Sequence, residues 1–110
     1  MITEGTITLP NGQTIHANSH GSYTVGSDVY PMVILGWTKS GKTIFCQEAK
    51  SRRCDGNGYG EDQAWMVWEN PNGRRFKATW RSKEKEFRRS YNKYGFVYTD
   101  KFRCYRDPSF

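Results

Sequence analysis

Residues 74–81 read Arg-Arg-Phe-Lys-Ala-Thr-Trp-Arg, and the prediction of the fold starts from this stretch. In an extended strand, Phe76, Ala78 and Trp80 fall on one side, while charged and polar side chains fall on the other. Such alternation is typical of a half-buried β-strand. The preceding turn, Asn-Pro-Asn-Gly at 70–73, contains Asn-Gly, which favours tight hairpins because both residues tolerate positive φ. We therefore predict a β-hairpin formed by 64–69 and 74–81.

Similar pairs of short apolar or alternating segments continue on both sides of this hairpin. The further strands that we expect are 6–9, 14–17, 30–37, 43–47, 95–98 and 101–105. Hairpins at short intervals are typical of a small antiparallel barrel or sandwich. The sequence thus predicts a mostly β fold in a single domain spanning 1–110. It has at most one short helix near 83–91, for which Ser82 would be the N-cap.

Composition limits the class of protein further. The 110 residues are 35% hydrophobic and 15% aromatic, so a small core built largely from rings is expected. No apolar run approaches the ~18 residues of a membrane span, and the first residues lack a signal-peptide pattern. We expect a cytoplasmic protein, in the host cytoplasm if it is phage-encoded, without membrane partners. The three cysteines form no Cys-x-x-Cys pair, so free thiols are expected rather than disulfides or zinc.

Positive charge is concentrated in residues 74–106. This segment holds twelve Lys or Arg residues against three acids, with nine aromatic rings among them, although the whole chain is only +6. A positive field with planar rings suits an anionic, planar partner such as a nucleotide or nucleic acid. The alternative is a solvated basic surface over an aromatic core.

Two motifs that suggest nucleotide hydrolysis or metal binding are not supported by the sequence around them. Residues 36–43 match the P-loop pattern G-x-x-x-x-G-K-[ST], but Thr-Ile-Phe-Cys at 43–46 favours a returning strand where a P-loop requires a helix. We therefore interpret this stretch as a hairpin turn. His16 and His20 have metal-ligand spacing only in a helix, and they lie in a β region. No spacing nominates a catalytic triad, so we expect a protein that is not an enzyme and needs no cofactor.

Clusters of Arg next to rings or acids are the candidate binding residues. Arg52 and Arg53 precede Asp55 and a Gly-rich loop, so they could clamp a phosphate while Asp55 orients a guanidinium or binds a ribose hydroxyl. A local Arg–Asp pair is the alternative. Near the C-terminus, Arg103 and Arg106 alternate with Tyr105, which suits base stacking beside a cation. The pair Arg75 and Phe76 repeats this pattern at a turn, where Arg residues are often only solvated.

A set of short motifs extends from about Ser27 onward. They are Ser27-Asp28, Gly41-Lys42-Thr43-Ile44 with Gln47, Arg53-Cys54-Asp55, Gly58, Gln63, Asn70-Pro71-Asn72-Gly73 and Arg103-Cys104-Tyr105-Arg106-Asp107-Pro108-Ser109-Phe110. With these motifs the chain resembles a family of small tailed-phage proteins. A weaker similarity is to the signal-sequestering sponge proteins that phages use against the Thoeris defence system. The resemblance implies a non-enzymatic, β-rich homo-oligomer that binds cyclic nucleotide signals through Arg and aromatic side chains. It adds Gln63 to the candidate ligand-binding residues. The chain departs from the expected pattern at Val29, where a basic residue is expected.

Three functions follow as hypotheses. The first is a phage-type counter-defence protein that sequesters a small anionic, cyclic nucleotide-like ligand. The second is a small basic barrel that binds DNA or RNA, or that inhibits a host defence nuclease as anti-CRISPR proteins do. The Lys/Arg run over 81–93 suits a phosphate backbone and therefore the second hypothesis. The third is a structural protein whose exposed rings form an oligomer interface.

Overall fold

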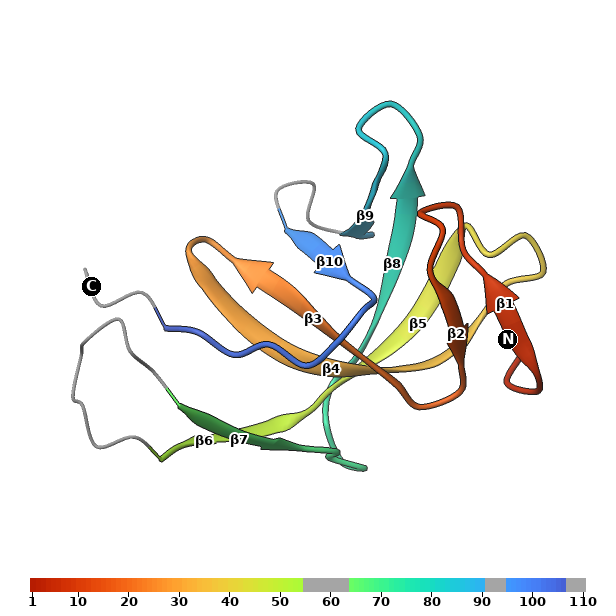
Figure 1. Cartoon of the computed structure of the whole chain (residues 1–110). Coiled ribbons are helices and arrows are strands. Elements are labelled where there is room, and N and C mark those ends of the chain that lie inside the picture. The colour runs from red at the N-terminus through yellow and green to blue at the C-terminus, as the bar shows by residue number, and fades with distance from the viewer. Residues whose placement is uncertain (55–63, 91–94, 107–110) are drawn as a thin grey trace.

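A closed antiparallel barrel forms the body of the protein. The computed structural model describes residues 1–54, 64–90 and 95–106 (Figure 1). The barrel strands are joined in the order β10-β3-β4-β5-β8-β9. They are β3 (Ser19–Val25), β4 (Asp28–Trp37), β5 (Thr43–Glu48), β8 (Arg75–Arg81), β9 (Glu86–Arg89) and β10 (Phe96–Tyr98). The prediction of a mostly β protein built as a small antiparallel barrel is therefore confirmed.

Two small sheets stand beside the barrel. The hairpin of β1 (Thr6–Thr8) and β2 (Thr14–His16) places Leu9 and Ile15 in the hydrophobic core. The second sheet pairs β6 (Lys50–Arg53) with β7 (Trp65–Trp68), and we refer to these two strands as the arm. In Figure 1 the arm lies at the lower left and the β1–β2 hairpin at the right of the barrel.

The barrel interior is filled by rings and branched aliphatic side chains. Phe76 and Ala78 of β8 are buried and Trp80 packs against the same cluster, so the predicted inward face of this strand is confirmed. Phe87 of β9 meets Trp80 edge to face at 5.2 Å between centroids. Such aromatic pairs add about 0.5–1.5 kcal/mol beyond the area that they bury.

The turn between β4 and β5 occupies the stretch that matches the P-loop pattern. Thr38 N donates to Thr43 O at 3.0 Å, and Gly41 N donates to Thr38 O at 2.9 Å. Gly41 has a φ of 73°, which a glycine adopts without strain. The strand that follows pairs directly with β4, so this segment is a hairpin turn, as predicted.

The predicted pairing of 64–69 with 74–81 is wrong. β7 pairs with β6, and β8 pairs with β5. The buried amide of Gln47 explains the change of sheet, because its Nε2 donates to Pro71 O at 3.0 Å and to Gly73 O at 3.1 Å. The turn at 70–73 is thereby bonded to the end of β5, where the chain passes from the arm to the barrel.

The one helix considered in the sequence, over 83–91, is absent from the described part of that stretch. Lys85 N donates to Arg81 O at 2.7 Å, and Lys85 has a φ of 57°, so the chain turns sharply before β9. β9 then pairs with β8 and brings Phe87, 1% exposed, into the core. Burial of this ring, worth about 1.5–3 kcal/mol, outweighs the small helix propensity of the charged residues around it.

The expected strand 101–105 is also not formed. β10 is already paired on both edges, with β3 and β9, so it offers no edge to a following strand. Residues 99–106 instead form an irregular segment with a bend at Asp100 and Lys101, which we call the strap. The strap crosses to β4, where Tyr105 forms a single antiparallel bridge with Val29 (Figure 1). None of the described residues belongs to a helix that could span a membrane.

Candidate functional site

The arm has two faces of different character. Because directly opposed residues of an antiparallel pair share a face, the register of β6 and β7 assigns each side chain. The inner face consists of Ser51, Arg53, Trp65 and Val67, all half-buried. The outer face consists of Lys50, Arg52, Met66 and Trp68, all exposed.

The inner face is held by the end of the strap. The Arg106 guanidinium carbon lies 4.3 Å from the centroid of the Tyr30 ring and 5.8 Å from that of Trp65. Arg106 Nη1 also donates a hydrogen bond of 3.0 Å to the Tyr30 hydroxyl. Arg53 lies on the same face, directly opposite Trp65. Two of the predicted Arg residues, far apart in sequence, therefore lie on the same side of the arm as Trp65.

Burial raises the pKa of two groups beside Arg106, the Tyr30 hydroxyl and the Cys104 thiol. It raises the pKa of the Tyr30 hydroxyl, an effect that Arg106 opposes and Asp28 reinforces. The protonated hydroxyl can thus donate to Asp28 Oδ2, at 3.4 Å, while it accepts from Arg106. Burial likewise raises the pKa of the Cys104 thiol, although a hydrogen bond with Ser51 and the charge of Arg106 lower it in part. The inner face is accordingly a packed, hydrogen-bonded junction of arm, strap and β4.

The outer face is open to solvent and combines cations with large apolar groups. Met66 is 58% exposed and Trp68 is 43% exposed. Lys50 lies opposite Trp68, and Arg52 lies opposite Met66. Neither cation forms an ion pair with another residue in the described ranges. This face presents an indole ring beside two positive charges that remain available to a partner.

The other sequence-predicted residues are dispersed. Arg103 is bound to Asp100, with Nη2 to Oδ2 at 2.7 Å, and its guanidinium carbon lies 5.0 Å from the Tyr98 centroid. Tyr105 bridges to Val29 through its backbone. Asp55 and Gln63 lie outside the described residues.

Arg75 and Phe76, predicted as a ligand-binding pair, have separate roles. Phe76 is only 5% exposed and meets Tyr23 edge to face at 5.0 Å, so its ring belongs to the core. Arg75 is exposed on β8, and both residues line an apolar hollow of about 190 Å³. Adjacent residues of a strand point to opposite sides, so the guanidinium group and the ring have different surroundings.

The sequence did not nominate Lys50, Met66 or Trp68. A signal was present, because Trp65 and Val67 alternate with Met66 and Trp68, and a strand with two apolar faces needs two partners. Only the pairing of β7 with β6 shows which Trp lies outward, and that pairing was not predicted.

The two histidines lie in strands, and both line a hollow of about 270 Å³. His16 is at the end of β2, and its Nδ1 lies 2.8 Å from Ala17 O. His20 on β3 stacks on Phe102 of the strap at 3.8 Å and lies 3.9 Å from a Glu69 carboxylate oxygen. Over 1–54, 64–90 and 95–106, no three His, Cys, Asp or Glu side chains gather as a metal site would require.

The chain was compared with protein-family models, curated proteins and solved structures, and none of them gave a match. The phage resemblance therefore remains an expectation, and the function has to be argued from the geometry of the site.

Proposed function

We propose that this protein is a non-enzymatic binding protein for single-stranded nucleic acid and that the outer face of the arm is its contact surface. One observation carries the proposal: Lys50, Arg52, Met66 and Trp68 share one exposed face of a two-stranded sheet. The face offers an indole ring to a base and two cations to phosphates.

Stacking and phosphate contacts would both contribute to binding at such a surface. Stacking of a base on an aromatic ring contributes about 1–3 kcal/mol per base and tolerates any sequence, because every base has a π-face. Each phosphate contact by Lys or Arg releases counterions, so affinity falls with salt. A net charge of +6 on 110 residues adds long-range attraction for a polyanion.

The open form of the arm favours a polymer over a small ligand. A small ligand is generally buried by 70–90% in its pocket. A two-stranded sheet contacts a partner from one side only. Each nucleotide therefore contributes little binding free energy, and several nucleotides must bind together. A single strand meets this condition because its neighbouring bases and phosphates bind in series.

A small anionic nucleotide is the second candidate, supported by the inner face of the arm. Arg53 is the register partner of Trp65, and Arg106 lies 5.8 Å from the Trp65 ring; two guanidinium groups on one face suit a phosphate. Under this proposal, the ligand would bind where the end of the strap contacts the inner face of the arm. Either ligand class is compatible with the counter-defence role that the phage resemblance implies.

A binding titration separates the two candidates. Labelled oligonucleotides of about 5, 10 and 20 nucleotides are titrated at about 50 and 300 mM salt by fluorescence anisotropy, and cyclic dinucleotides and ADP-ribose by calorimetry. We expect affinity to rise with oligonucleotide length and to fall steeply with salt. Tight, nearly salt-independent binding of a small nucleotide would favour the second candidate. Binding of neither would contradict both and leave the outer face as an interface with protein, including another copy of this chain.

Matched variants locate the contact. Trp68→Leu keeps an apolar side chain but removes the stacking ring, so it should weaken oligonucleotide binding by about 1–3 kcal/mol. Arg52→Gln should lower the salt slope by about 0.7, the value for one phosphate contact on a single strand. Lys39→Gln is the charge-matched control, because exposed Lys39 lies in the β4–β5 turn, at the other end of β5 from the arm. Equal effects of Arg52→Gln and Lys39→Gln would contradict the proposed contact surface.

A further inference from the structure

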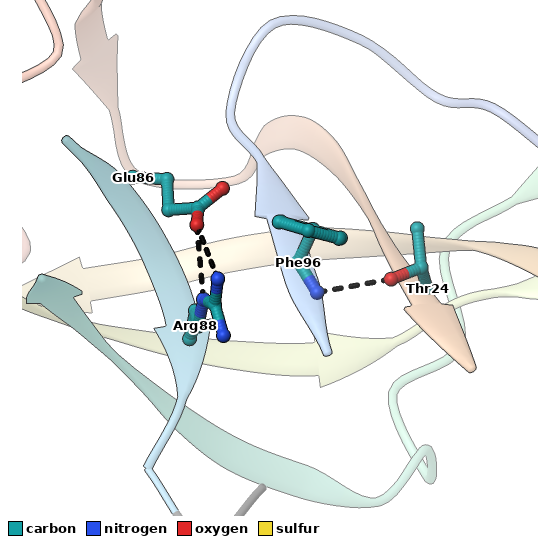
Figure 2. Close-up of polar contacts among 4 residues, drawn as sticks. All are labelled: Thr24, Glu86, Arg88 and Phe96. Carbon is teal, nitrogen blue, oxygen red and sulfur yellow. Dashed lines mark hydrogen bonds and ion pairs between the residues drawn. The ribbon is translucent and has the colours of Figure 1, made fainter. Parts of the chain in front are cut away.

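A second exposed aromatic surface lies on β10, apart from the arm. Phe96 is 37% exposed and Tyr98 is 39% exposed, whereas Val97 between them is buried in the core. Because strand side chains alternate, both rings stand on the outward side of β10. The strand is fixed to the barrel, since Phe96 N donates to Thr24 Oγ1 on β3 at 2.9 Å (Figure 2).

Each of these rings has a guanidinium group beside it. The Arg88 guanidinium carbon lies 4.9 Å from the centroid of Phe96, its register partner on β9. Glu86 orients this group by accepting from Arg88 Nε at 3.0 Å (Figure 2). The same arrangement recurs at Tyr98, where Arg103 lies 5.0 Å from the ring and is held by Asp100. Both carboxylates are thus neutralised by the Arg that they position.

A hollow of about 300 Å³ opens beside the rings. It is lined by Phe96 and Tyr98 of β10, by Lys85 in the turn before β9, and by Asn11 and Gln13 of the β1–β2 turn. The carboxylates of Glu86 and Asp100 also line it, each paired with the Arg that it holds. Asn11 Nδ2 donates to Thr99 Oγ1 at 2.9 Å, which fixes that turn against the end of β10. The volume is at the lower end of the range for ligand pockets.

The chemistry of this hollow matches one nucleotide of a single strand. We propose that the β10 face is a second nucleic-acid contact, in which a base stacks on Tyr98 or Phe96, the Gln13 amide of the β1–β2 turn meets the base edge, and Lys85 binds a phosphate. Amides pair with base edges, and a ring beside a guanidinium group is a stacking platform. The inference rests on the proposed function and extends it, because a strand would then contact two sites on one barrel.

Photocrosslinking of the wild-type protein tests this contact without any change to the fold. A 20-nucleotide strand carrying 4-thiothymidine is irradiated with the protein, and the crosslinked peptides are identified by mass spectrometry. We expect crosslinks within the peptide that contains Phe96 and Tyr98, in addition to those at Trp68. Crosslinks at the arm with none on β10 would overturn the inference and leave the proposed function standing. Failure of any oligonucleotide to bind would contradict the proposed function itself and this inference with it.

Two substitutions make the test quantitative. Tyr98→Leu should weaken binding of the 20-nucleotide strand about tenfold, the effect of losing one stacking platform. Lys85→Asn should lower the salt slope by about 0.7, and Asn tolerates the left-handed backbone of this position. Lys83→Gln, in the same turn but outside the lining of the hollow, is the matched control. Wild-type affinity and slope for both test variants, with Trp68→Leu still impaired, would overturn the β10 site alone.

Discussion

Arg106 of the strap and Tyr30 of β4 form a stacked and hydrogen-bonded pair. The guanidinium carbon lies 4.3 Å from the ring centroid, and Nη1 donates to the hydroxyl at 3.0 Å. Because Trp65 of the arm lies on the same guanidinium group, at 5.8 Å, one side chain links three segments of the chain. Arg106 is therefore a residue that ties the arm to the barrel.

Replacement of Arg106 by Gln should destabilise the protein. The loss of the cation–π contacts and of a charged hydrogen bond should cost about 1–2 kcal/mol, measured by urea unfolding. Arg52→Gln removes the same charge from the exposed outer face and should change stability by less than about 0.5 kcal/mol. Identical unfolding curves for Arg106→Gln and wild type would show that the strap is not held by this contact.

Phe76 and Phe96 allow a direct comparison of a core ring with a surface ring. Phe76→Ala should cost about 3–5 kcal/mol of folding stability, because it leaves a cavity in the barrel. Phe96→Ala should cost about 1 kcal/mol or less, since the ring is 37% exposed and loses mainly its contact with Arg88. Denaturant unfolding measures both. A stable Phe76→Ala variant with impaired ligand binding would mean that Phe76 contacts the ligand after all.

Gln47 should be essential to the placement of the turn at 70–73. In Gln47→Leu, the carbonyls of Pro71 and Gly73 lose their side-chain donor, at a cost of about 2–3 kcal/mol. Exposed Gln13, changed to Leu, is the control and should have little effect on chemical unfolding. Equal stability of the two variants would mean that water replaces the Gln47 amide without loss.

Stability should fall in alkaline solution. Burial, and next the hydrogen bond to Glu48, raise the pKa of Tyr23 well above 10, although Arg74 and Arg89 oppose this. The unfolded chain then loses this proton at a pH where the folded chain keeps it. The contribution of Tyr23 is complete below about pH 10 and declines above it, by up to about 1.4 kcal/mol per pH unit. Burial raises the pKa of Cys46 in the same direction, with the decline starting near pH 9.

The variant Tyr23→Phe isolates the tyrosine contribution. Its free energy of unfolding should be lower than that of wild type at pH 8, because the hydrogen bond to Glu48 is lost. Above pH 10 its stability should decline less steeply with pH. The measurement is urea unfolding between pH 8 and 11.5. A decline as steep as in wild type would exclude Tyr23 as a source of the alkaline instability.

The three thiols should react with a disulfide reagent in a fixed order. Cys54 is exposed and should react first, Cys104 is half-buried with a raised pKa and should follow, and Cys46 is buried in the core. Cys46 should be modified only when the barrel unfolds. Mass spectrometry of labelled peptides at pH 8 gives the order. Modification of native Cys46 at the rate of Cys54 would contradict its place in the core.

Local sequence patterns predicted the strands better than their partners. The alternation around Phe76 and the turn at 39–42 were sufficient for β8 and for the β4–β5 hairpin. The strands β3, β6 and β9 were not predicted. In β9 the charged residues around Phe87 favour a helix locally, and only the space beside Trp80 makes a strand preferable. Propensity is a weak preference that tertiary packing overrides.

By itself the sequence determined the class of fold, the core face of β8 and the concentration of positive charge, since these follow from periodicity and composition. The tertiary structure alone decided which charges and rings are available. Contacts between residues distant in sequence bring Arg106 to Tyr30 and Trp65, bury Phe76, and leave Trp68, Phe96 and Tyr98 exposed. Such contacts depend on which strands pair, and strand pairing is set by the closure of the whole barrel rather than by any short segment.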